Sequence, residues 1–195
     1  MSLGSAWEEF RSKLGFATIE LGCRLARGGG AYPITKPINP LDIEVLGDKQ
    51  FQASVNEVSE LTLLDTPRLA NLWTLCRLAP EGNILEVGSY KGGGALHLSN
   101  SCPQRKIIVC DSFEGFETVR SDLDRKFGTY MFKDSSQKEV ERLFESRGRL
   151  YEVIQGFFPA SAAGKPIGPI SFVHLDADVY KATKESLFYR PTGTT

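Results

Sequence analysis

A glycine-rich turn with a carboxylate at its base is the feature of this sequence that most directly indicates ligand chemistry. The turn spans residues 88–94, between an apolar run and a helical pattern, and Glu86 lies two positions before it. Glycine lets the backbone approach a ligand closely and adopt positive φ. The free N–H groups of the following helix suit a carboxylate. Glu86 repels phosphate and suits an ammonium group, so the turn predicts a ligand that carries both groups.

Acidic residues end two other apolar runs. Asp111 comes about 20 residues beyond Gly88, where an acid at a strand end accepts hydrogen bonds from ribose hydroxyls. Asp176 ends a later run, and Asp178 follows two residues on. Asp111 alone is also compatible with capping the following turn. Asp176 and Asp178 are also compatible with a solvated strand end that caps a helix.

A dinucleotide-binding oxidoreductase is the alternative that the glycine turn must be weighed against. That fold needs the pattern G-x-G-x-x-G, whose second glycine admits a pyrophosphate. Here Gly88 is followed by Ser89 and Tyr90, and the next glycine is Gly92. S-adenosylmethionine carries an ammonium group, a carboxylate and a ribose but no phosphate. The spacing and Glu86 therefore favour a methyl donor over NAD.

Strands that alternate with helices position these residues. The apolar runs predict strands over 83–87, 106–110 (ending in Asp111), 151–154 and 170–175 (ending in Asp176). Helical spacing predicts helices over 66–78, from Ala95 onward and over 135–147, with Thr66 as the cap of the first and Pro67 at its first position. This order predicts an α/β fold with a parallel sheet and helices on both faces.

A separate segment precedes this pattern. Residues 6–26 have the spacing of an amphipathic helix, and Gly28 to Gly30 end it. We therefore expect an N-terminal arm or lid over residues 1–58 and a ligand-binding domain over residues 59–195.

Four blocks, taken in order, resemble the macrocin O-methyltransferase family of class I S-adenosylmethionine-dependent methyltransferases. They are I-L-E-V-G-S-Y-K-G-G from Ile84, D-S-F-E-G from Asp111, Q-G-F-F from Gln155 and H-L-D-A-D-V-Y from His174, with Thr183 after it. The resemblance covers roughly residues 60 to 190. It implies a Rossmann-like sheet and magnesium-dependent O-methylation of a hydroxyl on a sugar or natural-product-like small molecule.

The resemblance also implies roles for single residues. Asp176 would be the catalytic residue and a metal ligand, because it matches the family aspartate that lies close to the acceptor hydroxyl. Asp111 would hold the ribose. The residues expected to bind the cofactor are Glu86, Gly88, Ser89, Tyr90, Gly92, Asp111, Ser112, Phe113, Gln155 and Gly156.

The sequence departs from the family after the helix that starts at Tyr180. The family continues into a strand whose paired aspartates complete the metal site, whereas this chain ends at Thr195. We therefore expect a sheet that is C-terminally truncated, with residues 170–175 as an exposed edge that invites pairing in a homo-oligomer. A catalytically inactive, cofactor-binding fragment stays an alternative.

Composition limits the possible partners. The 195 residues are 41% hydrophobic and 24% charged, with a net charge of −1, which gives no attraction for nucleic acid or an anionic membrane. Two histidines and four cysteines without a CxxC pair argue against zinc and favour a reduced, cytoplasmic protein. Of the remaining polar residues, His174 is predicted to be a satisfied core histidine, and the charges from Arg120 to Lys126 a solvated loop.

Overall fold

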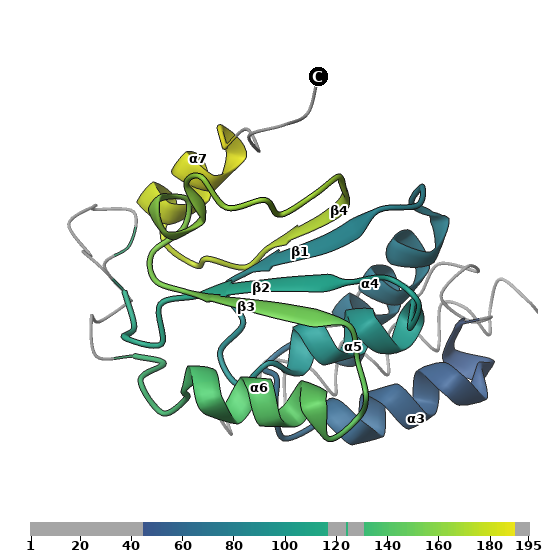
Figure 1. Ribbon diagram of the computed structural model, residues 1–195. Helices are drawn as coiled ribbons and strands as arrows, with labels where there is room; N and C mark the ends of the chain where they lie inside the picture. Colours follow the sequence, from purple (N-terminus) through teal and green to yellow (C-terminus); the bar gives the residue numbers. More distant parts are fainter. Residues whose placement is uncertain (1–44, 117–123, 125–130, 190–195) are drawn as a thin grey trace, which may run out of the picture. The chain divides into compact units, whose positions relative to one another are not determined.

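The computed structural model describes residues 45–116, 124 and 131–189 (Figure 1). The predicted helix over residues 6–26 therefore lies outside the described residues. The described residues belong to one compact unit, Pro40–Thr195. The boundary at residue 58 between an arm and a domain stays a prediction.

The sheet has four parallel strands in the order β3-β2-β1-β4. The strands are β1 (Asn83–Val87), β2 (Ile107–Asp111), β3 (Tyr151–Gln155) and β4 (Ile170–Leu175). Two of them have the bounds predicted from the sequence, and the other two differ by one residue at an end. Because β4 adds on the far side of β1, the strand order reverses between β1 and β4. Ligand sites of α/β proteins lie at such reversals.

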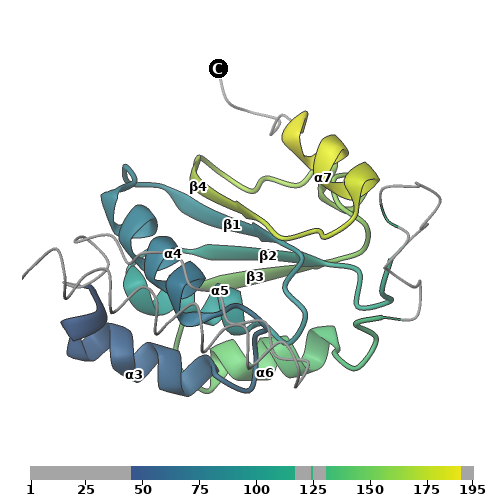
Figure 2. The same cartoon turned by 180° about the vertical axis from the view of Figure 1, so that it is seen from behind.

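Helices cover one face of the sheet (Figure 2). They are α3 (Lys49–Val58), α4 (Thr66–Leu78), α5 (Gly93–Ser101) and α6 (Gln137–Glu145). The apolar side chains at their centre, among them Phe51, Trp73 and Leu96, form one buried cluster with Ile84, Ile107 and Val109 of the sheet. Phe51 and Val58 of α3 belong to this cluster, so α3 is part of the core.

The other face of the sheet is covered by the chain between β3 and β4 and by the end of α7. This part contains the 3₁₀ helix η2 (Ala160–Ala162) and α7 (Tyr180–Leu187). Phe158 and Ile167 pack there against Leu85, Ile108 and Ile154 of the sheet. The predicted α/β architecture, with a Rossmann-like parallel sheet between two layers, is thus confirmed.

Capping corrects one detail of the prediction. The helix α4 is capped by Asp65, whose Oδ1 accepts the Arg68 N–H at 3.0 Å, and not by Thr66. Thr66 is the first helical residue, with Pro67 after it. An aspartate with extended backbone accepts this bond as well as threonine does, so Asp65 takes the capping position and Thr66 lies inside the helix.

The edge position of β4 was predicted, and it holds within the described strands. Only β1 pairs with β4, and Val173 of β4 is 49% exposed. Self-association through this edge stays a prediction. No described helix combines the length and apolarity that crossing a membrane requires.

Candidate active site

A cavity of about 400 Å³ opens at the carboxyl ends of the strands, where the strand order reverses. It brings together eight of the residues predicted to form the site: Glu86, Gly88, Ser89, Tyr90, Asp111, Ser112, Gly156 and Asp176. Three others do not line it. Gly92 packs against Val140 and Leu143, Phe113 is buried in the core cluster, and Gln155 is exposed at the end of β3.

The glycine turn has the left-handed backbone that its sequence predicted. Gly88 has a φ of +85°, and a side chain there would overlap the carbonyl oxygen of Asp176. Gly92 has a φ of +82°. These conformations are open to glycine and costly for other residues. The end of β1 therefore lies directly against the end of β4.

The N–H groups of the turn correct one expectation. The sequence predicted that the start of α5 points free N–H groups at a ligand. It holds only in part: the Gly93 N–H donates to the Leu61 carbonyl at 3.2 Å and the Gly92 N–H donates to the Ser89 carbonyl at 2.8 Å, whereas the Gly94 N–H has no partner among the described residues and Gly94 lines the cavity. The reason is that the segment between α3 and α4 folds over the N-terminus of α5, a contact that local sequence does not encode.

Asp111 connects the end of β2 to the turn. Its Oδ2 accepts the N–H groups of Ser89 at 2.7 Å and Tyr90 at 2.9 Å. Its Oδ1 accepts the Phe113 N–H at 2.8 Å, so the carboxylate also caps the turn that follows β2. The capping role that the sequence left open is therefore present, and the same carboxylate lines the cavity.

Glu86 is a buried carboxylate on the cavity wall, with only 1% of its surface exposed. Its Oε1 lies 3.0 Å from Nδ1 of His174, while its Oε2 has no hydrogen-bond partner among the described residues. Burial raises the pKa of Glu86, and the imidazole of His174 only partly offsets this. Glu86 lines the cavity, and its buried Oε2 is an acceptor that no described residue satisfies; an ammonium group that reached this oxygen would satisfy it.

His174 is satisfied as predicted, with Glu86 as its partner. Burial alone lowers the pKa of His174, but the hydrogen bond and the negative charge of Glu86 outweigh it and raise that pKa. The imidazole therefore lies behind the cavity-lining Glu86 and contacts its carboxylate. His174 is therefore placed to hold the carboxylate of Glu86 in position.

Two carboxylates follow β4. Asp176 and Asp178 both line the cavity, and Asp178 has a φ of +58°. Within the described part of the chain, no three histidine, cysteine or acidic side chains gather closely enough to hold a metal ion. The two aspartates are carboxylates close together in sequence at the cavity, which Glu86, Asp111 and Glu185 also line.

Several cavity residues were missed by the sequence analysis. They come from the segment before α4, from the chain after β3 and from α7, and they include Thr62, Leu64, Arg68, Phe157, Lys181 and Glu185. Arg68 carried a signal. A cation in the first turn of a helix opposes the helix dipole, so its presence there indicates another role.

The solvated loop predicted for residues 120–126 is wrong at Asp124. Asp124 is 4% exposed, and its Oδ1 accepts the N–H of Tyr180 at 3.0 Å, at the start of α7. The other residues of that segment lie outside the described ones. Local sequence could not indicate the burial of Asp124, because its partner is 56 residues away.

The parallel sheet, the cavity at its strand-order reversal and the acids near the carboxyl ends of β1, β2 and β4 are those of a protein with a Rossmann-like, class I methyltransferase fold. Residues 61–190 match the sequence model of the family described as Macrocin-O-methyltransferase (TylF). The chain belongs to this family.

Two curated relatives act on named natural products. One is the 8-demethyl-8-(2,3-dimethoxy-alpha-L-rhamnosyl)-tetracenomycin-C 4'-O-methyltransferase of Streptomyces olivaceus, 26% identical over 65% of this chain and 55% of the relative. The other is the demethyldecarbamoylnovobiocin O-methyltransferase of Streptomyces niveus, 27% identical over 54% of this chain and 46% of the relative. The chain thus spans about half the length of each relative.

Among solved structures, the calicheamicin methyltransferase CalS11 matches with a TM-score of 0.45 and 20% identity. The match covers 78% of this chain and 77% of that chain.

Proposed function

We propose that this chain binds S-adenosylmethionine in the cavity and forms the core of an enzyme that methylates a hydroxyl of a sugar or natural-product-like small molecule. The observation that carries the proposal is the buried Oε2 of Glu86, which lines the cavity without a described partner. The ammonium group of the methyl donor would supply the missing hydrogen bond. Membership of the family and the names of the two relatives, both O-methyltransferases, support the reaction class.

Asp111 has room for one further hydrogen bond. A carboxylate offers about four lone-pair positions, and three N–H groups of the protein occupy three of them. One position on Oδ1 therefore remains for a ribose hydroxyl. The N–H bonds fix the orientation of the carboxylate before the ligand arrives, which lowers the entropy cost of binding.

Asp176 is the proposed base. Methylation forms an oxygen–carbon bond as the sulfur–carbon bond of the donor breaks, and the acceptor hydroxyl must lose its proton. The bound donor supplies the methyl group as a sulfonium. Asp176 is a solvent-exposed carboxylate on the cavity wall, where it is placed to accept this proton.

Magnesium assistance is the finer part of the proposal. Mg²⁺ is often held by one or two carboxylates, with water and substrate completing its ligands. Asp176 and Asp178 are the residues that would hold it here. A bound divalent cation would lower the pKa of an acceptor hydroxyl.

Two other functions make different predictions. A fragment that binds the cofactor without turnover would share the cavity, and the chain spans only about half of its curated relatives. A nucleotide-binding oxidoreductase would bring a pyrophosphate to the glycine turn, close to the buried carboxylate of Glu86. Repulsion between these negative groups disfavours it.

Calorimetric titration tests the proposal. We expect S-adenosylhomocysteine to bind and NAD not to bind. Glu86→Gln should weaken S-adenosylhomocysteine by about 10- to 100-fold, because a hydrogen bond to a charged partner loses its charge. Glu139→Gln, on the exposed side of α6, is the matched control and should bind as the wild type does.

A response to NAD alone would contradict the proposal. If S-adenosylhomocysteine binds, an assay of methyl transfer with and without Mg²⁺ separates the enzyme from the inactive fragment. Turnover that is indifferent to Mg²⁺ would remove the metal from the proposal and leave the methyl transfer.

A further inference from the structure

Arg68 places a positive charge on the cavity wall, and no contact within the described residues explains it. It lies in the first turn of α4 and lines the same cavity as Glu86. Its backbone N–H is bound by Asp65, but its guanidinium has no hydrogen bond or ion pair to any residue in the described part of the chain. The side chain is exposed, so it is free to meet a ligand.

The position of Arg68 is unfavourable for the helix itself. A positive charge in the first turn opposes the helix dipole and destabilises the helix. The first turn of α4 holds no acidic residue, and the carboxylate of the N-cap Asp65 accepts the Arg68 backbone N–H rather than its guanidinium. Helix stability therefore does not account for an arginine here.

The glycine turn leaves a ligand carboxylate in need of a donor. The N–H groups of Ser89 and Tyr90 are bound to Asp111, and the N–H group of Gly93 is bound to Leu61. A helix start usually offers such groups to anions. Because the N–H groups of Ser89, Tyr90 and Gly93 are taken, a carboxylate at this turn gains from a side-chain cation, and Arg68 is a cation that lines the cavity.

We infer that Arg68 binds the carboxylate of the amino-acid end of the methyl donor, while the free Oε2 of Glu86 binds its ammonium group. This inference rests on the proposed function and assigns a binding residue within it. A guanidinium presents paired N–H groups that match both oxygens of a carboxylate. Two opposite charges on one cavity then select a zwitterion, and a phosphate that meets Arg68 is repelled by Glu86.

A pair of ligands isolates this contact. S-adenosylhomocysteine carries the amino-acid end, and 5'-methylthioadenosine has the same nucleoside without it. Calorimetry is carried out with both ligands on the wild type, on Arg68→Gln and on Arg68→Lys. Arg77→Gln is the matched control, because Arg77 lies on the same helix outside the cavity and pairs with Asp48.

Arg68→Gln should weaken S-adenosylhomocysteine by about 10- to 100-fold and leave 5'-methylthioadenosine unchanged. Arg68→Lys keeps the charge without the paired geometry, so its affinity for S-adenosylhomocysteine should fall between the two. Arg77→Gln should bind both ligands as the wild type does. Thermal melting of each variant verifies that it is folded.

The outcomes separate this inference from the proposed function. If the wild type does not bind S-adenosylhomocysteine, the proposed function fails. If the wild type binds it and Arg68→Gln binds it equally well, only the role of Arg68 is overturned. Equal weakening of both ligands also overturns that role, because Arg68 would then shape the cavity rather than recognise the carboxylate.

Discussion

The two histidines of the chain lie in regions whose polar groups are arranged in opposite ways. His97 of α5 is fully buried between helices, where Nδ1 lies 2.8 Å from the Ser54 hydroxyl and Nε2 lies 3.0 Å from the Leu69 carbonyl. His174 of β4 has one polar contact among the described residues, the carboxylate of Glu86, which lines the cavity. Both ring nitrogens of the first histidine thus have protein partners, whereas the second histidine contacts a group on the cavity wall.

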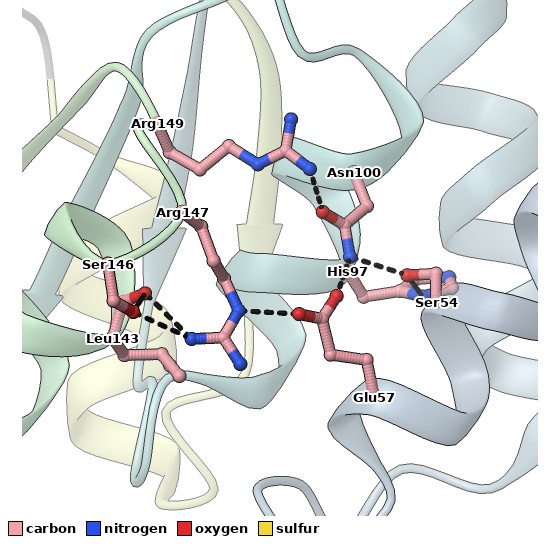
Figure 3. A network of polar contacts seen from close by, with 8 residues as sticks. All are labelled: Ser54, Glu57, His97, Asn100, Leu143, Ser146, Arg147 and Arg149. Atoms are coloured by element: carbon pink, nitrogen blue, oxygen red, sulfur yellow. Dashed lines mark hydrogen bonds and ion pairs between the residues drawn. The ribbon is translucent and has the colours of Figure 1, made fainter.

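The helical region extends from Ser54 into a network that joins three elements (Figure 3). Asn100 of α5 donates to Ser54 and to Glu57 of α3. Arg147, which follows α6, donates to Glu57 at 2.5 Å, and Arg149 donates to Asn100 at 2.5 Å. The network therefore fastens α3 and the end of α6 to α5, through protein partners.

The pKa shifts of the buried groups also differ between the helical region and the cavity. Burial lowers the pKa of His97 to about 4, and the bond to the Leu69 carbonyl only partly offsets this, so the ring is neutral at pH 7. Burial raises the pKa of Glu86 while one of its oxygens stays without a partner. Polar groups that satisfy one another stabilise a fold, and a buried polar group left open indicates function.

The largest expected effect tests the cavity region. Gly88→Ala should lower the free energy of unfolding by about 4 kcal/mol, because it adds positive-φ strain and an overlap with the Asp176 carbonyl. Gly148 has a φ of +59°, and a Cβ at this position would meet no atom within 4 Å, so Gly148→Ala should cost only about 1 kcal/mol. Urea unfolding of both variants measures the difference. Equal costs would mean that β1 and β4 do not pack together as described.

The next prediction uses pH to test whether His97 is buried and neutral in the folded helical region. Because the folded state holds His97 neutral, the unfolded state takes up a proton first as pH falls below 6.5. Stability should therefore decrease between pH 6.5 and about 4, and this histidine alone should contribute a loss of about 3 kcal/mol. The measurement is urea unfolding across that range.

His97→Gln is the control for the pH effect, since it removes the titrating ring and keeps a polar side chain. Its stability should vary less steeply with pH over the same range, although it starts lower at pH 7. Identical slopes in both proteins would show that His97 is accessible to protons in the folded state.

The smallest effect tests the outer part of the network. Arg147 and Glu57 are each about one third exposed. Burial alone raises the pKa of Glu57, but hydrogen bonds from Arg147 and Asn100 outweigh it and lower that pKa. Since exposed ion pairs are weak, Arg147→Ala should cost only about 0.5 kcal/mol in urea unfolding. If Arg147→Ala lowered the free energy of unfolding as much as Gly88→Ala does, the two regions would not differ in the way described.

Local patterns predicted the elements, and long-range contacts account for what was missed. The bounds of β1 and β4 follow from apolar runs that end before Gly88 and Asp176, and the glycine turn follows from its composition. The contact of Leu61 with Gly93 and the burial of Asp124 depend on segments far apart in sequence. The same holds for Arg68, whose place on the cavity wall follows from how α4 packs on α5.

The absent side chain of Gly88 has a consequence for protein engineering. The backbone of Asp176 occupies the space that a side chain at residue 88 would need, so the glycine turn after β1 and the segment after β4 are packed against each other. Grafting a new segment after β4 would therefore shift the glycine turn as well. Chimeras of this fold should therefore exchange both segments together.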